Sequence, residues 1–80
     1  MLKVLLFGRL ADVAGWRERE LAVPPTLLVL REILSREDAA LGAALGAIGV
    51  QTALNQVLTR GDADLAGVSE VAFLPPMSGG

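Results

Sequence analysis

Short apolar runs alternate with turn-forming residues along the chain, which predicts a small sheet of about five strands. The most apolar runs lie at the two ends, over residues 2–7 and 70–74. Such nearly continuous hydrophobicity is typical of central strands. The Asn55-Gln56 pair is suited to a turn between two weaker runs, because Asn tolerates positive φ. Weaker runs predict the three remaining strands, over residues 17–23, 50–54 and 57–59.

One longer segment has helical periodicity instead. It begins after Thr26, a residue type that often caps helix N-termini, and its charged residues lie off the apolar stripe. This pattern predicts an amphipathic helix with one buried face. The residues of the stripe are Leu27, Leu30, Ile33 and Leu34.

Two shorter segments also have apolar residues at helical spacing. Residues 9–15 predict one helical turn that ends at Gly15, a natural C-cap. A second stripe predicts another short helix or an extension of the first, which the glycines at 42, 46 and 49 weaken. Residues 60–69 are rich in turn formers, so we expect them at the surface. The second stripe consists of Leu41, Ala44, Leu45 and Ile48.

The order of these elements predicts an α+β domain with the β-grasp, or ubiquitin-like, arrangement. The main helix follows the first two strands, where it can cross between hairpins and cover one face of a mixed sheet. We expect the first and last strands to lie side by side in the centre as a parallel pair. Residues 1–74 then form the domain, and residues 75–80 form a flexible C-terminal tail that starts from a central strand.

The composition excludes several classes of function. The 80 residues contain no Cys, His or Tyr, so we expect no metal site with Cys or His ligands and no catalytic triad. A net charge of −2 without a basic run argues against nucleic-acid binding. No apolar run is long enough for a membrane span, and no signal peptide is evident, so we expect a cytoplasmic protein. Catalysis by this chain alone is not expected.

The C-terminal segment from Pro75 to Gly80 is the feature around which the chain is organised. Proline donates no backbone hydrogen bond and glycine loses the most entropy on ordering, so we expect these residues to extend from the domain. Six residues span at most roughly 20 Å. A glycine-rich end without a function is the plain alternative. Because Cys and His are absent, however, the terminal carboxylate is the chemically useful group that remains.

Three segments resemble the small subunit of molybdopterin synthase, that is, the MoaD-like group of ubiquitin-like sulfur carriers. These segments are residues 2–7, the Leu54-Asn55-Gln56 turn, and above all residues 70–80. The Pro-Pro-x-x-Gly-Gly ending favours this group over the thiazole-synthesis carriers. The family commonly has Gly-Asp before the last strand, whereas this chain has Val68-Ser69 with Gly67 one position early.

The resemblance implies a carrier function for Gly80, with Gly79 beside it. An E1-like enzyme would use ATP to adenylate the Gly80 carboxylate, and a sulfur donor would convert it to a thiocarboxylate. The large catalytic subunit, in an expected heterotetramer, would then receive the sulfur for cyclic pyranopterin monophosphate and form the dithiolene of molybdopterin. No permanently bound cofactor is implied.

Partner contacts are expected at the tail and on the sheet face that the helix leaves open. The alternative that Leu58 and Leu74 are ordinary core residues stays open, and Arg9, Arg17 and Arg60 are expected to be surface or interface charges. Two other functions remain possible: a sulfur carrier for thiazole or tRNA thiolation, and a ubiquitin-like protein modifier. The candidate partner-binding residues are Leu58, Leu74, Pro75, Pro76, Met77 and Ser78.

Overall fold

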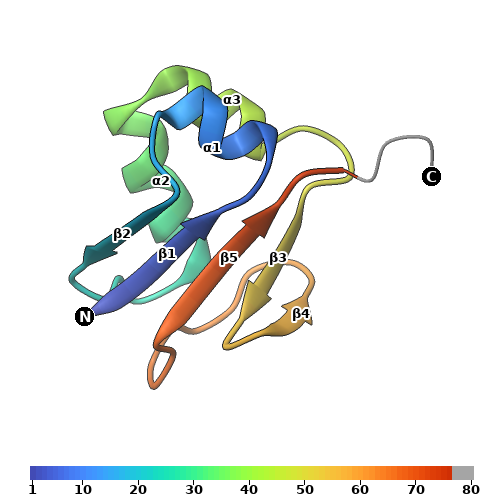
Figure 1. Cartoon of the computed structure of the whole chain (residues 1–80). Coiled ribbons are helices and arrows are strands. Elements are labelled where there is room, and N and C mark those ends of the chain that lie inside the picture. Colours follow the sequence, from blue (N-terminus) through green and yellow to red (C-terminus); the bar gives the residue numbers. More distant parts are fainter. Residues whose placement is uncertain (77–80) are drawn as a thin grey trace.

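The computed structural model describes residues 1–76, which form one five-stranded sheet and three helices (Figure 1). All five predicted strands are present, and the predicted short helices are separate elements. In chain order the elements are β1 (Leu2–Leu6), α1 (Arg9–Ala14), β2 (Glu18–Leu21), α2 (Leu27–Glu37), α3 (Ala39–Leu45), β3 (Gln51–Leu54), β4 (Val57–Thr59) and β5 (Glu70–Leu74).

The sheet has the strand order β2-β1-β5-β3-β4. The two most apolar strands, β1 and β5, are parallel neighbours in the register Leu6↔Phe73, whereas the other neighbouring pairs are antiparallel. The predicted β-grasp arrangement with a central parallel pair is therefore confirmed. Because β5 is bonded on both sides, the residues that follow it leave from a rigid part of the sheet.

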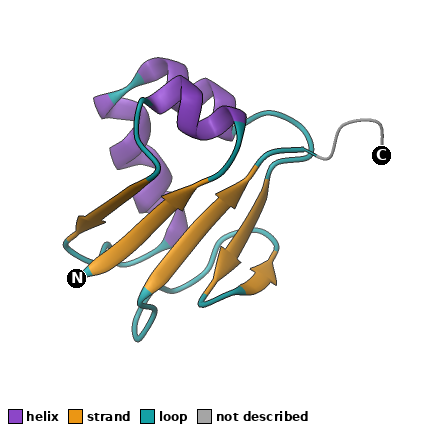
Figure 2. Cartoon of the chain, in the orientation of Figure 1, coloured by secondary structure: helices purple, strands orange, loops and turns teal. Residues whose placement is uncertain are grey.

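The helices cover one face of the sheet and leave the other face open (Figure 2). The prediction of one main helix on this face holds for α2, with the shorter α1 and α3 beside it. Alternate residues of β1 and β5 point toward the helices and are buried there. The largest fully buried side chains include Leu2, Leu6, Leu27, Leu30, Leu34, Leu41, Leu65 and Phe73.

Helix α2 begins as the sequence predicts. Thr26 has extended backbone angles, and its hydroxyl accepts a hydrogen bond from the Val29 N–H at 3.2 Å. Of the predicted stripe, Leu27, Leu30 and Leu34 are buried, while Ile33 is half-buried.

The second predicted stripe is only partly correct. Leu41 and Leu45 are buried in α3, but Ile48 is 97% exposed. Helix α3 ends at Leu45, and the loop that follows carries Ile48 off the helical repeat and into solvent. The glycine at 42 is also not a simple weakness: a Cβ there would lie 2.9 Å from Ser35 Cα, so this glycine lets α3 approach α2 closely.

The turn-rich segment 60–69 is not purely a surface loop, contrary to expectation. Leu65 is fully buried in the core. Backbone hydrogen bonds hold the segment against the start of α2, from Leu65 N to Pro25 O and from Leu27 N to Ala63 O. Leu65, with the partly buried Val68, thus anchors the segment to the core. Strand β1 also differs from the prediction: it ends at Leu6, one residue earlier than predicted, and Phe7 is 44% exposed.

Candidate functional site

The candidate site is the end of β5 together with the two loops that flank it. The Phe7 N–H donates a 3.2 Å hydrogen bond to the carbonyl of Phe73, which extends the β1–β5 pairing to the last residues of the strand. On the other side, Leu74 is paired with Gln51 at the start of β3. The chain therefore leaves the sheet between two fixed neighbours. Figure 1 shows this end of the molecule opposite the N-terminus.

At the root of the tail, the two prolines pack against two glycines of the neighbouring loops. A Cβ at Gly8 would lie 3.1 Å from Pro75 Cγ, and one at Gly49 would lie 2.9 Å from Pro76 Cβ. Both glycines have positive φ, +53° and +91°, which side chains with a Cβ rarely adopt. We expected the segment from Pro75 not to pack; instead its first two residues lie against the domain, and Pro75 is half-buried. Met77, Ser78, Gly79 and Gly80 lie outside the described residues.

The open face of the sheet carries an apolar hollow of about 400 Å³ next to this exit. Leu58 is 60% exposed, so the alternative that it belongs to the core is wrong. Leu74 is half-buried at the edge of the hollow. We call the apolar residues of this surface the open-face patch, which consists of Leu5, Phe7, Ala53, Leu58, Ala72 and Leu74.

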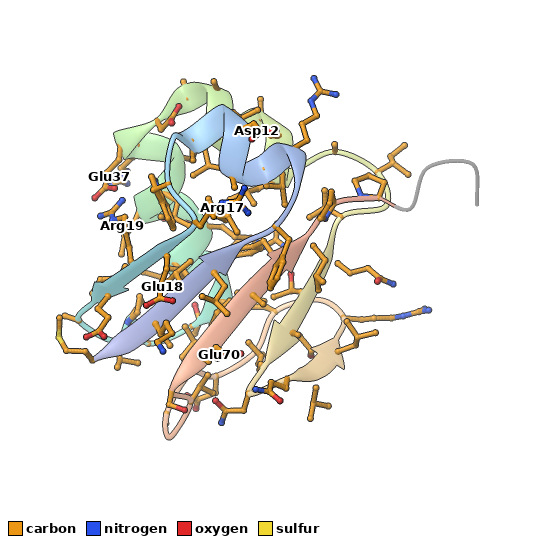
Figure 3. The ribbon with its side chains drawn as sticks, viewed as in Figure 1. Asp12, Arg17, Glu18, Arg19, Glu37 and Glu70 are labelled. Carbon is orange, nitrogen blue, oxygen red and sulfur yellow. The ribbon has the colours of Figure 1, made fainter. Side chains whose placement is uncertain are left out.

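The end of the open face remote from the tail is charged. Lys3 is paired in register with Glu20 of β2 on one side and with Glu70 of β5 on the other. Glu18, opposite Leu5, extends this acidic margin along β2 (Figure 3). Because these charges lie at the start of β1 and β5 and along the β2 edge, the apolar part of the face lies between them and the exit of the tail. An exposed apolar patch with a polar margin is typical of a protein–protein interaction site.

The turn before β5, where this chain departs from the family pattern, is well ordered by side-chain contacts. Gly67 has φ +77°, and the Val68 N–H donates a 3.0 Å bond to the Leu65 carbonyl, which closes a β-turn one position early. The Asn55 Oδ1 accepts hydrogen bonds from Ser69 N, Ser69 Oγ and Glu70 N at 3.0–3.1 Å. Ser69 in place of the usual Asp therefore ties the β3–β4 turn to the start of β5.

Asn55 and Gln56 form the predicted hairpin turn between β3 and β4. Both have positive φ, +48° and +69°, as the two-residue turns that suit right-twisted hairpins require. The tolerance of Asn for positive φ predicts this conformation at Asn55, whereas Gln has no such preference.

Arg31 holds the helical layer to the sheet, a role that its place off the apolar stripe did not suggest. Its guanidinium donates to the hydroxyl of buried Thr52 at 2.9 Å and to the Leu45 carbonyl at the end of α3 at 3.2 Å. It also lies over the Phe73 ring, 5.3 Å from the centroid. One side chain of α2 thus fixes α3, β3 and β5 close to the root of the tail.

At the other edge of the sheet, Arg19 and Glu37 form a salt bridge of 2.8 Å (Figure 3). The hydrogen bond from Arg19 lowers the pKa of Glu37, with a further contribution from the Arg19 charge, and the same bond raises the pKa of Arg19. Arg19 also lies 5.1 Å from the centroid of the half-buried Trp16 ring. This cluster is remote from β5, so we assign it to stability.

Within residues 1–76, the structure contains no group of three or more acidic, His or Cys side chains that might hold a metal ion. No helix in this part of the chain has the length and apolar character needed to cross a membrane. Arg9, Arg17 and Arg60 are exposed, as expected for surface charges.

Comparisons with known proteins agree with the resemblance found in the residues. The molybdopterin synthase sulfur carrier subunit of Escherichia coli (strain K12) is 35% identical over 81 residues, which cover 100% of both chains. The crystal structure of SAMP1 from Haloferax volcanii superposes with a TM-score of 0.72 at 26% identity, over 99% of this chain and 98% of that one.

A second structure of the same archaeal protein, named small archaeal modifier protein 1, has a TM-score of 0.71 at 23% identity. It covers 95% of this chain and 97% of its own, and it supports the fold alone. The family model described as the ThiS family matches residues 4–80, which include all of the sheet except the first two residues of β1, together with the C-terminal tail. This match and the full-length identity of 35% show that the chain belongs to the ThiS family.

Proposed function

We propose that this chain is the sulfur-carrier subunit of a molybdopterin synthase and carries sulfur as a thiocarboxylate on Gly80. The observation that carries the proposal is the full-length match to the sulfur carrier subunit of E. coli molybdopterin synthase. The position of the tail supports it, because β5 is the central strand of the sheet and Pro75 and Pro76 are seated on fixed loops. A tail held at its root presents its end to a partner with less loss of entropy on binding.

The proposed chemistry takes place at the Gly80 carboxyl carbon. A carboxylate oxygen attacks the α-phosphorus of ATP in the adenylating enzyme, and pyrophosphate leaves. The acyl-adenylate has a good leaving group, so sulfide delivered by the donor attacks the carbonyl carbon and displaces AMP, which leaves a thiocarboxylate. In the large subunit, the thiocarboxylate sulfur bonds to a carbon of cyclic pyranopterin monophosphate and displaces an oxygen substituent; water then cleaves the resulting thioester and regenerates the Gly80 carboxylate. With no Cys in the chain, its side chains offer no thiol to carry the sulfur.

The partners supply the groups that this chain lacks. The chain contains no His, the side chain that most often serves in general acid–base catalysis near neutral pH. Its own contribution is therefore recognition and delivery. The open-face patch, which lies next to the exit of the tail, is the surface we assign to the large subunit.

Intact-mass analysis tests the proposal. We expect incubation with the adenylating enzyme, ATP and the sulfur donor to add the mass difference between sulfur and oxygen, located on the last residue by fragmentation. Deleting Gly80 abolishes the mass change and dithiolene formation while leaving the unfolding curve unchanged. The variant Gly80→Ala keeps the length and the carboxylate, and so separates loss of the reacting group from poor fit of a Cβ. Normal dithiolene formation by the deletion variant would refute the proposal.

A second candidate function is protein modification. The 26% identity to SAMP1 of Haloferax volcanii, which is named a small archaeal modifier protein, favours it. In that case the activated Gly80 carbonyl would be attacked by a lysine of a target protein. The test is whether tagged carrier forms covalent high-mass conjugates in its own cells that disappear when Gly80 is deleted. Free thiocarboxylate without conjugates favours the carrier function.

Exchanging the enzyme that receives the sulfur tests which pathway the carrier serves. If a large subunit of molybdopterin synthase accepts sulfur from the loaded chain, whereas thiazole- and tRNA-thiolation enzymes do not, the pathway proposed here is supported. The reverse pattern would assign the chain to another sulfur pathway without changing the role of Gly80.

A further inference from the structure

Arg31 contacts the two segments that meet at the root of the tail. Its guanidinium donates to the Leu45 carbonyl, where α3 ends, and to the Thr52 hydroxyl near the start of β3. The loop of residues 46–50 lies between these two partners. The same guanidinium lies 5.3 Å from the ring centroid of Phe73, near the end of β5. One planar group therefore holds both ends of the loop and the strand from which the tail leaves.

The loop of residues 46–50 is short and internally bonded, and it contacts the tail directly. The Val50 N–H donates a 3.3 Å hydrogen bond to the Ala47 carbonyl, which closes a tight turn. Within this turn Gly49 packs against Pro76, where an added Cβ would lie 2.9 Å from Pro76 Cβ. Well-packed neighbours transmit a displacement instead of absorbing it. The loop therefore conveys to the root of the tail the position that the guanidinium sets.

The shortness of the tail makes its direction at Pro76 important for the chemistry. Four residues follow Pro76, and they span at most roughly 14 Å. A tilt of about 20° at the root would therefore move the Gly80 carboxyl carbon by about 5 Å. Misplacement of a reacting group by about 1 Å can slow a reaction about 100-fold. The direction of the root thus affects the rate at which sulfur is transferred.

We infer that Arg31 is a positioning residue for sulfur transfer, which acts through the loop of residues 46–50 on the direction of Pro76. The inference rests on the proposed function. Arg31 belongs to α2, on the helical side of the sheet, and is not part of the open-face patch that we assign to docking (Figure 2). Its loss therefore leaves docking of the domain unchanged and slows the step that follows docking.

The test measures sulfur transfer to cyclic pyranopterin monophosphate by the large subunit, with the full chain, loaded as the Gly80 thiocarboxylate, as the varied substrate. We expect Arg31→Met to lower kcat about tenfold, while KM for the loaded chain stays within about twofold. A residue that only stabilised the fold would not produce this split once the variant is folded.

Two variants of the same helix serve as controls. Thr26→Ala removes the N-cap of α2 and so lowers stability, but Thr26 lies where the helix bridges to Asp64 and not at the root of the tail. Arg36→Met removes the same charge as Arg31→Met from an exposed position. We expect both controls to keep kcat and KM within about twofold of the wild-type values.

A double variant determines whether the effect passes through Pro76. Pro76→Gly removes the ring and the Cβ that lie against Gly49, so we expect it to lower kcat by itself. If Arg31 acts through this contact, adding Arg31→Met to Pro76→Gly lowers kcat by less than a further factor of about two. Losses that multiply would show that Arg31 acts by another route and would overturn the inference.

Thermal unfolding identifies any variant that fails to fold. If Arg31→Met is one of these, Thr52→Val replaces it in the test, because it exchanges only the hydroxyl that accepts from Arg31 for a methyl group, and we expect it to lower kcat about threefold. A wild-type kcat in the folded variant, an equal loss in Thr26→Ala, or a loss confined to KM would each overturn the inference. If the loaded wild-type chain transfers no sulfur, the proposed function itself fails, which is a distinct result.

Discussion

Gly49 and Pro76 are packed so closely that no Cβ fits between them: one built on Gly49 would lie 2.9 Å from Pro76 Cβ. Gly49 belongs to the loop that leads from α3 into β3, and Pro76 is the second residue after β5. The contact therefore joins the start of the tail to the helical layer. Gly8 makes the corresponding contact with Pro75 on the β1 side. The direction in which the tail leaves the domain is set by these two glycines as well as by the prolines.

The first prediction uses this contact. Gly49→Ala adds both backbone strain at φ +91° and a clash with Pro76, which together destabilise the fold by about 2–4 kcal/mol. Gly61→Ala is the matched control, because Gly61 has φ +71° but nothing within 4 Å of its Cβ, and we expect it to cost about 1 kcal/mol. Urea unfolding measures both. Equal losses for the two variants would show that Pro76 is not held by Gly49.

Arg31 yields the second prediction. Arg31→Met keeps a long apolar stem but leaves the Thr52 hydroxyl and the Leu45 carbonyl without their charged donor. Because Thr52 is only 3% exposed, we expect a loss of about 1.5–3 kcal/mol in the free energy of unfolding. Arg36→Met, an exposed position on the same helix, changes stability by about 0.5 kcal/mol. A loss at Arg31 no larger than that at Arg36 contradicts the role described for its hydrogen bonds.

The turn that precedes β5 gives the third prediction. Asn55→Gly keeps the positive φ but removes the oxygen that accepts three hydrogen bonds from Ser69 and Glu70, and we expect a cost of about 1–2 kcal/mol. Asn55→Ala costs about 1 kcal/mol more, because it adds strain at φ +48°. Hydrogen exchange at the Glu70 amide increases in both. If Asn55→Gly matches the wild type in unfolding and exchange, the side-chain bonds contribute nothing.

The sequence predicted the features that depend on neighbours along the chain. Thr26 caps α2 because the N–H that it satisfies lies three residues along the chain, and Asn55 turns the β3–β4 hairpin because its own backbone tolerates positive φ. The two most apolar strands also identified the central parallel pair. In each case the local pattern and the tertiary arrangement favour the same structure.

Features that depend on contacts between distant segments were missed. The sequence pattern predicts that Gly42 weakens its helix, whereas in the structure the missing Cβ lets Ser35 of α2 pack closely against α3. Arg31 lies off the apolar stripe of α2, as a surface arginine would. Its partners Thr52 and Phe73 come from strands that are distant in the sequence. Ile48 has the spacing of the helical repeat, but α3 ends at Leu45, three residues before it. The groove between α1 and α3 has no signature in the sequence because α1, α3 and the prolines after β5 line it jointly.

The fourth prediction concerns pH. The pKa of Glu37 is lowered in the folded chain, so its carboxylate adds stability above the pKa of the unfolded state, and this contribution is lost as the pH falls through the folded pKa. Both side chains of the pair are more than a third exposed, which limits the effect to about 0.5 kcal/mol. Glu37→Gln is therefore less stable than the wild type near pH ~7 and equally stable near pH ~3. A difference that persists in acid, or that is insensitive to salt, would exclude the ion pair as its source.

The last prediction tests the open-face patch with two adjacent residues of β4. Leu58 pairs with Ala53 and points to the open face, whereas Val57 pairs with Leu54 and points the other way. Their side chains are similarly exposed, at 60% and 67%, so replacing either by Ser has little effect on stability. If the large subunit covers the open face, Leu58→Ser weakens its binding about tenfold, as expected for an interface anchor, and Val57→Ser does not. Calorimetric titration of the large subunit with each variant measures the difference. Because strand geometry sends the two side chains to opposite faces, equal weakening by both would point to an edge contact along β4, and no weakening by either would remove this face from the interface.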